Sequence, residues 1–154
     1  INTNRRLLFM TSKPPPSRGR GRPRRAEADA EILDAALAML RAGGYRELSL
    51  DEVARRAGTA KSSIYRRWPS KAALVAEVVR RESPPQHDAS HRDAAARAFQ
   101  ILMNGALGGV VASLIGEAQE SGETRAIVID LLAPYRGADD AALGAILFRR
   151  LLGT

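Results

Sequence analysis

Residues 47–71 read ELSLDEVARRAGTAKSSIYRRWPSK, and this stretch decides how the amino-terminal half of the chain folds. Ser49-Leu-Asp-Glu52 has the form of a capping box, in which a serine and a glutamate each satisfy a free backbone N–H at a helix start. Gly58 ends that helix, Thr59 caps the next one, and Pro69 prevents the second helix from continuing. Two short helices joined by a tight turn are the layout of a helix-turn-helix, whose second helix enters the major groove of DNA.

Apolar residues at helical spacing predict one further helix on each side of this stretch. The first covers residues 27–42 and ends at Gly43-Gly44, because glycine adopts the left-handed cap conformation at little cost. The other starts at Ser70, its capping residue, and ends before Ser83-Pro84-Pro85. The inward-facing residues of these two helices are predicted to be Ile32, Leu33, Ala36, Leu37, Leu40, Leu74, Val75, Val78 and Val79.

The remaining sequence also has helical patterning. Residues 94–119 form one long or two shorter helices, 124–132 another, and 138–154 a last one. Alanine, leucine and arginine dominate the composition, and runs of β-branched residues are scarce, so we expect an all-α chain. Its predicted parts are a disordered basic arm (1–25), a three-helix helix-turn-helix domain (26–83) and a helical carboxy-terminal domain (90–154).

Charge is distributed unevenly along the chain. Residues 1–82 hold 18 Lys and Arg against 9 Asp and Glu, whereas residues 83–154 hold 6 against 8. A basic half beside a mildly acidic half is typical of a nucleic-acid-binding module joined to a part with another role. Without cysteine, disulfides and thiolate metal sites are excluded.

Other classes of site find little support in the sequence. His87 and His91 lie four residues apart but have no third ligand nearby, so no metal and no cofactor are expected. The sequence shows neither a nucleophile–base pairing nor a phosphate-cradling loop, which argues against an enzyme. The apolar run 101–116 is too short for a membrane span, and no targeting segment is convincing, so we expect a soluble, cytoplasmic protein.

The second helix of the helix-turn-helix carries the candidate DNA contacts. Ile64 and Trp68 share one face and are predicted to pack onto the first two helices. Early positions have the shortest reach to base edges, which makes Lys61, Ser62 and Ser63 the predicted base contacts. The start of the helix after Pro69 offers free N–H groups and a cation to a phosphate. The predicted phosphate contacts are Thr59, Tyr65, Arg66, Arg67, Ser70 and Lys71.

The basic arm adds a second candidate DNA contact. Arg20-Gly-Arg-Pro23 matches the core of an AT-hook, an extended peptide that lays arginines along a narrow minor groove. Next to a helix-turn-helix, such an arm is predicted to insert Arg20, Arg22 and Arg24 into the groove adjacent to the one that the helix reads.

Residues 27–82 resemble the amino-terminal domain of the TetR family of bacterial transcriptional repressors. The similar motifs are Leu48-Ser-Leu-Asp-Glu-Val-Ala54, Ala57-Gly58 and the ending Ile64-Tyr-Arg-Arg-Trp-Pro-Ser-Lys71. The resemblance implies an all-helical homodimer that binds operator DNA, with Tyr65 and Lys71 on phosphates, residues 61–63 facing bases, and a carboxy-terminal domain that binds a small ligand.

Two departures from the family pattern qualify this expectation. The order Thr59-Ala60 after the turn glycine differs from the usual small apolar residue and serine, so the cap can shift by one residue. Only about twenty residues follow Pro134, fewer than two long dimerisation helices need. The carboxy-terminal domain is therefore expected to be incomplete, and the sequence does not identify the ligand-binding residues.

The sequence thus predicts a cytoplasmic repressor that a small molecule releases from a pseudo-palindromic operator. An alternative is an architectural DNA-binding protein that acts through the arginine tail, residues 18–25, with little sequence preference. A more distant alternative is a helical ligand-binding or enzymatic protein whose basic surface is incidental.

Overall fold

The computed structural model describes residues 21–82, 92–135 and 144–147, and every regular element within these ranges is helical. The elements are α1 (Gly21–Glu47), α2 (Leu50–Arg56), α3 (Lys61–Tyr65), α4 (Lys71–Glu82), α5 (Arg92–Asn104), α6 (Gly108–Glu117), α7 (Gly122–Leu132) and the 3-10 turn η1 (Ala133–Tyr135). Residues 144–147 are also helical. The expectation of an all-α chain is confirmed for this part of the molecule.

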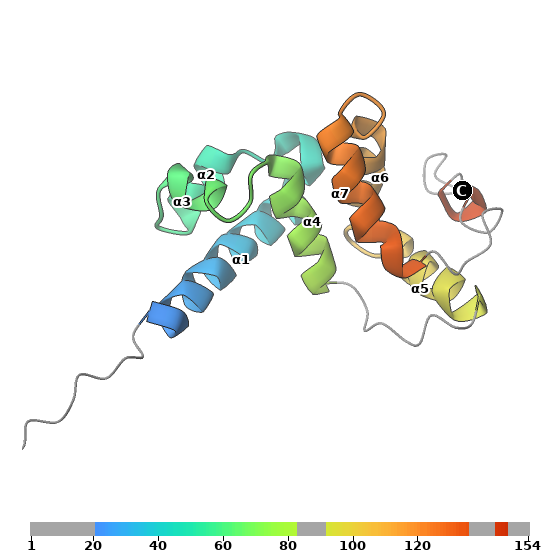
Figure 1. The fold of residues 1–154 in the computed structure, drawn as a ribbon, viewed down its shortest axis with the longest axis horizontal. Coiled ribbons are helices and arrows are strands. Elements are labelled where there is room, and N and C mark those ends of the chain that lie inside the picture. The colour runs from blue at the N-terminus through green and yellow to red at the C-terminus, as the bar shows by residue number, and fades with distance from the viewer. Residues whose placement is uncertain (1–20, 83–91, 136–143, 148–154) are drawn as a thin grey trace, which may run out of the picture.

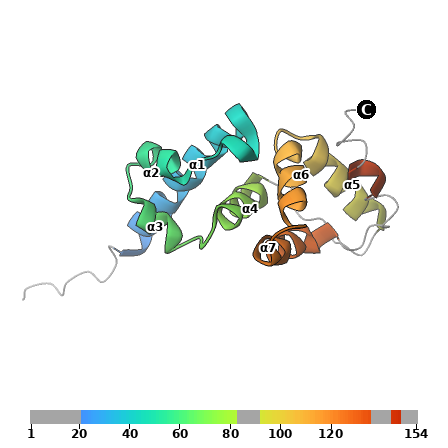
Figure 2. The same ribbon diagram turned by 90° about the horizontal axis from the view of Figure 1, so that it is seen from above.

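The helices lie in three groups along the molecule (Figure 1). At one end α2 and α3 pack beside α1, in the middle lies α4, and α5, α6 and α7 form the other end. Figure 2 shows the same order from above, with α4 between the helix-turn-helix and the carboxy-terminal helices.

The regular part of α1 ends at the glycine pair, as predicted. Gly44 has φ 73° and ψ −169°, which is non-helical, and Glu47 ends the short turn that follows. Because only glycine takes such a positive φ cheaply, the chain reverses here. The Leu48 N–H donates to the Tyr45 carbonyl at 3.3 Å, which closes the turn and leaves Tyr45 only 7% exposed.

At its other end α1 begins earlier than the sequence indicates. The predicted disordered arm covers residues 1–25, whereas Gly21–Arg25 already belong to α1. Pro23 lies in the first turn of α1. Backbone N–H groups in a first turn have no intrahelical acceptor, so proline, which lacks an N–H, loses no hydrogen bond there, and its fixed φ suits the helix. Arg22 and Arg24 are therefore helical rather than extended. Arg20 lies outside the described residues.

Neither hydrogen bond of the predicted capping box forms at the start of α2. Ser49 is the N-cap residue with extended backbone, but it makes no side-chain cap hydrogen bond. Glu52 instead accepts hydrogen bonds from Arg55 at 2.6 and 2.8 Å and from Arg56 at 2.7 Å. These bonds, that of Arg55 first, lower the pKa of Glu52 to about 2. The predicted reciprocal bond is wrong because two guanidinium groups bind the carboxylate more strongly than a neutral N–H does.

The cap of α3 is displaced by one residue. Ala60, not Thr59, is the N-cap of α3. The Thr59 N–H donates to the Ala54 carbonyl at 2.9 Å across Gly58, whose φ is 59°. This is the pattern of a Schellman motif, so Thr59 completes the end of α2 instead of starting α3. The predicted cap of α4 is confirmed, since Ser70 Oγ accepts from the Ala73 N–H at 3.2 Å.

The carboxy-terminal residues form separate helices. Residues 94–119 contain two helices, α5 and α6, whose axes differ by 98°. The next helix starts at Gly122, two residues before its predicted start, with Ser121 Oγ accepting from the Thr124 N–H at 3.2 Å. Within the described ranges no single helix has the length and hydropathy to cross a membrane; only the bent α5–α6 pair passes that test, on length and composition alone.

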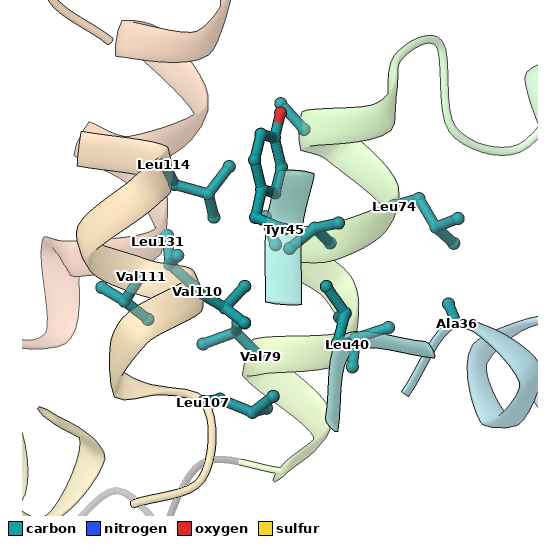
Figure 3. Packing of buried hydrophobic residues seen from close by; sticks show 14 of the residues in the cluster. Ala36, Leu40, Tyr45, Leu74, Val79, Leu107, Val110, Val111, Leu114 and Leu131 are labelled. Carbon is teal, nitrogen blue, oxygen red and sulfur yellow. The ribbon is translucent and has the colours of Figure 1, made fainter. Parts of the chain in front are cut away.

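One apolar cluster joins the two predicted domains (Figure 3). An exposed ion pair, Arg80 with Asp130 at 2.5 Å, also links α4 to α7. Such surface pairs contribute about 0–1 kcal/mol to the free energy of unfolding, so apolar packing contributes most of the stability of this junction. The division into 26–83 and 90–154 remains a prediction, because the two parts share this core. Members of the cluster at the junction are Leu40, Tyr45, Val79, Leu107, Val110, Val111, Leu114 and Leu131.

Candidate nucleic-acid interface

The helix α3 is anchored on one side and exposed on the other. Ile64 is fully buried and is the single buried residue of this helix. Trp68, four residues later, packs half-buried against the core, as the sequence predicts. On the remaining surface, the exposed side chains are Lys61, Ser62, Tyr65 and Arg66. Tyr65 is one of the few large hydrophobic residues with substantial exposure in the described ranges, at 46%.

Lys61 extends from the first position of α3 toward the start of α2. Its Nζ lies 2.8 Å from Asp51 Oδ2, in an exposed ion pair. The hydrogen bond to Asp51 is the main cause that raises the pKa of Lys61 above its usual value. Lys61 is therefore a full cation at neutral pH, located where α2 and α3 meet.

The two serines of α3 differ in their surroundings. Ser62 is exposed, whereas Ser63 is half-buried and its Oγ accepts a hydrogen bond from Arg66 Nη2 at 3.1 Å. Ser62 can therefore present its hydroxyl to a base edge directly, whereas the Ser63 oxygen already accepts from Arg66 and keeps its own O–H to donate.

The side chain of Arg67 is half-buried, whereas that of its neighbour Arg66 is exposed. Its Nε donates to Asp29 Oδ1 in α1, and its Nη1 donates to the Ser63 carbonyl at 2.8 Å. The Arg67 side chain is only 15% exposed. The sequence treats Arg66 and Arg67 as equivalent phosphate clamps, but the structure holds Arg67 between α1 and α3. Its partner Asp29 lies in α1, 38 positions earlier in the chain.

Arg67→Ala is expected to lower the free energy of unfolding by about 1–3 kcal/mol, because it removes charged hydrogen bonds from a partly buried site. Arg66→Ala, at the neighbouring exposed position, is the matched control and should stay within about 0.5 kcal/mol. Urea unfolding followed by circular dichroism measures both. Equal stabilities of the two variants would contradict a structural role for Arg67.

Lys71 lies at the start of α4, where the sequence predicts a phosphate contact. Its Nζ lies 4.5 Å from the centroid of the Tyr45 ring and donates to the Arg46 carbonyl at 3.3 Å. Burial lowers the pKa of Lys71. The neighbouring Ser70 hydroxyl caps α4. The sequence did not identify Tyr45 as part of this site, and no local pattern could have placed it there, because it lies 26 positions before Lys71.

The structure therefore brings most of the predicted contacts onto α3 and the start of α4. Thr59 is half-buried in the preceding turn, and Arg22 and Arg24 belong to the first turns of α1. Among the described residues, no group of three or more His, Cys, Asp or Glu could hold a metal ion. His87 and His91 lie outside those residues.

Comparison with known proteins gives the same assignment for the amino-terminal half. Residues 32–78 match the family model described as bacterial regulatory proteins, tetR family. An uncharacterized HTH-type transcriptional regulator of Mycobacterium tuberculosis is 36% identical over 78 residues, which is 48% of this chain and 39% of that protein. The DNA-binding transcriptional repressor TetR of Mycobacteroides abscessus is 41% identical over 64 residues, which is 42% of this chain and 31% of that protein.

Two further proteins are similar to a larger share of the chain. The HTH-type regulator YdeS of Bacillus subtilis is 31% identical over 107 residues, covering 65% of this chain and 54% of that protein. A crystal structure from Mesorhizobium loti, assigned to the TetR family, covers 84% of this chain and 70% of that one, with 24% identity and a TM-score of 0.46. The chain thus spans about two-fifths of the first of these curated relatives. The family consists of regulators, not enzymes. With α2 and α3 arranged as a helix-turn-helix, residues 32–78 of this chain match the TetR family of bacterial regulatory proteins.

Proposed function

We propose that this chain is a sequence-specific DNA-binding transcriptional regulator that reads its operator with α3. The observation that carries the proposal is the one-sided burial of this helix. Ile64 is fully buried, while the polar side chains around it face solvent. A helix held in this way can enter the major groove with its exposed edge against the bases.

The exposed residues divide into two proposed classes of contact. Lys61 suits the O6 and N7 acceptors of guanine, and Ser62 can donate to or accept from any base edge. Tyr65, Arg66 and Lys71 are proposed to contact phosphates, which fix the position of the helix but carry no sequence information. Arg67 is withdrawn from this set because its side chain is only 15% exposed and is bonded to Asp29 and to the Ser63 carbonyl.

We further propose that the protein is a repressor, acts as a homodimer in the bacterial cytoplasm and releases DNA when a small molecule binds. The match of residues 32–78 to the family model and the named repressor among the similar proteins support this proposal. A hollow of about 450 Å³ on α5, lined by Arg97, Gln100, Ile101, Asn104 and Gly105, falls in the size range of small-molecule sites. It is our candidate for the ligand site.

The deciding experiment measures binding to specific and random DNA. Selection from random duplexes yields the preferred operator, and dissociation constants for operator and random duplexes are then compared at several salt concentrations. A specificity ratio above about 10³ supports the regulator. Equal affinities with a steep salt dependence would instead favour the architectural alternative. Absence of DNA binding would contradict both proposals. The helical state of Gly21–Arg25 already weakens the alternative, because an AT-hook must be extended.

Substitution of α3 residues separates base contacts from phosphate contacts. Lys61→Ala is expected to cost about 1–3 kcal/mol of binding free energy on the operator and to relax the preference at one base position. Tyr65→Ala should weaken operator and random duplexes by similar factors, since phosphates are common to all sequences. Repeating the selection with each variant gives both readouts. An unchanged base preference for Lys61→Ala would show that the orientation of α3 is wrong.

A further inference from the structure

Lys71, a proposed phosphate contact at the start of α4, lies against the face of an aromatic ring. Its Nζ is 4.5 Å from the centroid of the Tyr45 ring, within the range of a cation–π interaction. The same ammonium group donates a hydrogen bond to the Arg46 carbonyl at 3.3 Å. Two consecutive residues near the end of α1 therefore hold the Lys71 ammonium group on two sides.

The Tyr45 ring is itself held in place by the backbone and by apolar packing. Gly44, with φ 73°, reverses the chain directly before it, and the Tyr45 carbonyl accepts a hydrogen bond from the Leu48 N–H at 3.3 Å. The side chain is buried in the apolar cluster, and Figure 3 shows its ring between α4 and α6. A ring packed in this way has few alternative positions, because protein interiors are close-packed.

The contact restricts a side chain that is otherwise flexible. A lysine has a long stem with many rotamers, and ordering such a side chain at an interface costs binding free energy. Lys71 has lost part of this freedom before any DNA binds, since the ring and the carbonyl already occupy two of its sides. Burial also lowers the pKa of Lys71, and a partly desolvated cation is attracted more strongly to an aromatic face than a fully hydrated one.

We propose that Tyr45 is a positioning residue for DNA binding, whose ring orients the Lys71 ammonium group toward a phosphate. An ammonium group has three N–H donors, and the Arg46 carbonyl accepts from one of them. The ring attracts the cation through its negative face, so N–H donors remain for a phosphate oxygen. Tyr45 contributes without touching the DNA, because its side chain is only 7% exposed. This inference rests on the proposed DNA-binding function.

A positioning ring and a purely structural core residue respond differently to substitution. A structural residue at position 45 tolerates another apolar side chain of similar bulk, and its effect on DNA binding does not depend on residue 71. A positioning ring needs its aromatic face, and it acts only when Lys71 is present. Tyr45→Leu keeps apolar bulk and removes the ring, whereas Tyr45→Phe keeps the ring and is the matched control.

NMR of the whole chain with ¹³C-labelled lysine reports the contact in the absence of DNA. The chain contains three lysines, Lys13, Lys61 and Lys71, and Lys71→Arg identifies the Lys71 signal by its loss. The ring current of Tyr45 should shift the Lys71 Hε signal upfield of the signals of the other two lysines. The order parameter of the Lys71 side chain should fall in Tyr45→Leu and be retained in Tyr45→Phe.

DNA binding supplies the second readout. Tyr45→Leu is expected to weaken binding to operator and random duplexes by about 3- to 10-fold, the cost of ordering one freed side chain, whereas Tyr45→Phe should change it by less than about 2-fold. A trifluorinated phenylalanine at position 45 keeps the shape of the ring and weakens its negative face, so it should bind DNA less tightly than Tyr45→Phe. This variant decides the question even if Tyr45→Leu does not fold.

The role of Lys71 is tested by repeating the substitution without it. In a Lys71→Ala background, Tyr45→Leu should leave the affinity for DNA unchanged. An equal loss of affinity with and without Lys71 would overturn the inference, as would equal affinities of Tyr45→Phe and its trifluorinated analogue or an unshifted Lys71 signal. If the unmodified chain binds DNA and Lys71→Ala does not weaken that binding, this inference fails alone and the proposed regulator stands. If the unmodified chain binds no DNA, both fail.

Discussion

Replacing Ile64 with alanine is expected to lower the free energy of unfolding by about 2–5 kcal/mol, the range found for large-to-small changes in protein cores. Ile64 is fully buried and is the single buried residue of α3. Helices as short as these five residues are not stable by themselves, so tertiary packing must hold α3 in place. Removing most of the sec-butyl side chain therefore leaves both a cavity and a helix without its main anchor.

The measurement is urea unfolding of the full-length chain, with Ser62→Ala as the control. Ser62 is exposed on the same helix, and its replacement should change stability by no more than about 0.5 kcal/mol. Ile64→Ala should also reduce operator binding under conditions where the rest of the protein stays folded, because α3 must be ordered again on the DNA. A loss of stability below about 1 kcal/mol would show that other contacts position α3.

Much of this arrangement could be predicted from local sequence patterns. Helical spacing identified the buried face of α3, and the glycine pair after α1 identified the chain reversal, since a positive φ strongly favours glycine. The competing partners of Glu52 were also visible, because Arg55 and Arg56 lie three and four residues on. The sequence analysis assigns Glu52 to a capping box, although its ion pairs with Arg55 and Arg56 are the stronger interactions.

The features that sequence patterns missed depend on residues far apart in the chain. Arg67 and Asp29 are 38 positions apart. Tyr45 and Lys71 meet only in the packed structure, where the Lys71 ammonium group lies over the Tyr45 ring. Composition misled the prediction at residues 21–25, where proline, glycine and arginine indicated disorder but proline is compatible with a first helical turn. Local patterns therefore predict where the helices lie, and only the packed structure shows which polar residues have a structural role.

Replacing Gly108 with alanine is expected to destabilise the carboxy-terminal helices strongly. A Cβ atom at Gly108 would lie 1.8 Å from the backbone oxygen of Met103 and 2.6 Å from its carbonyl carbon. Met103 is fully buried, so its backbone has no free space into which it could withdraw. Overpacking typically costs about 1–3 kcal/mol, and a clash with a buried backbone carbonyl should reach or exceed the upper end of that range. Relief requires a change in the 98° bend between α5 and α6.

Gly116 provides a matched control on the same helix. It is exposed in α6, and a Cβ atom added there would meet nothing within 4 Å. Gly116→Ala should raise stability by about 0.5–1 kcal/mol, because alanine loses less backbone entropy in a helix than glycine does. Opposite signs for the two alanine variants in urea unfolding would establish that the close approach at Gly108, and not helix propensity, sets the α5–α6 bend.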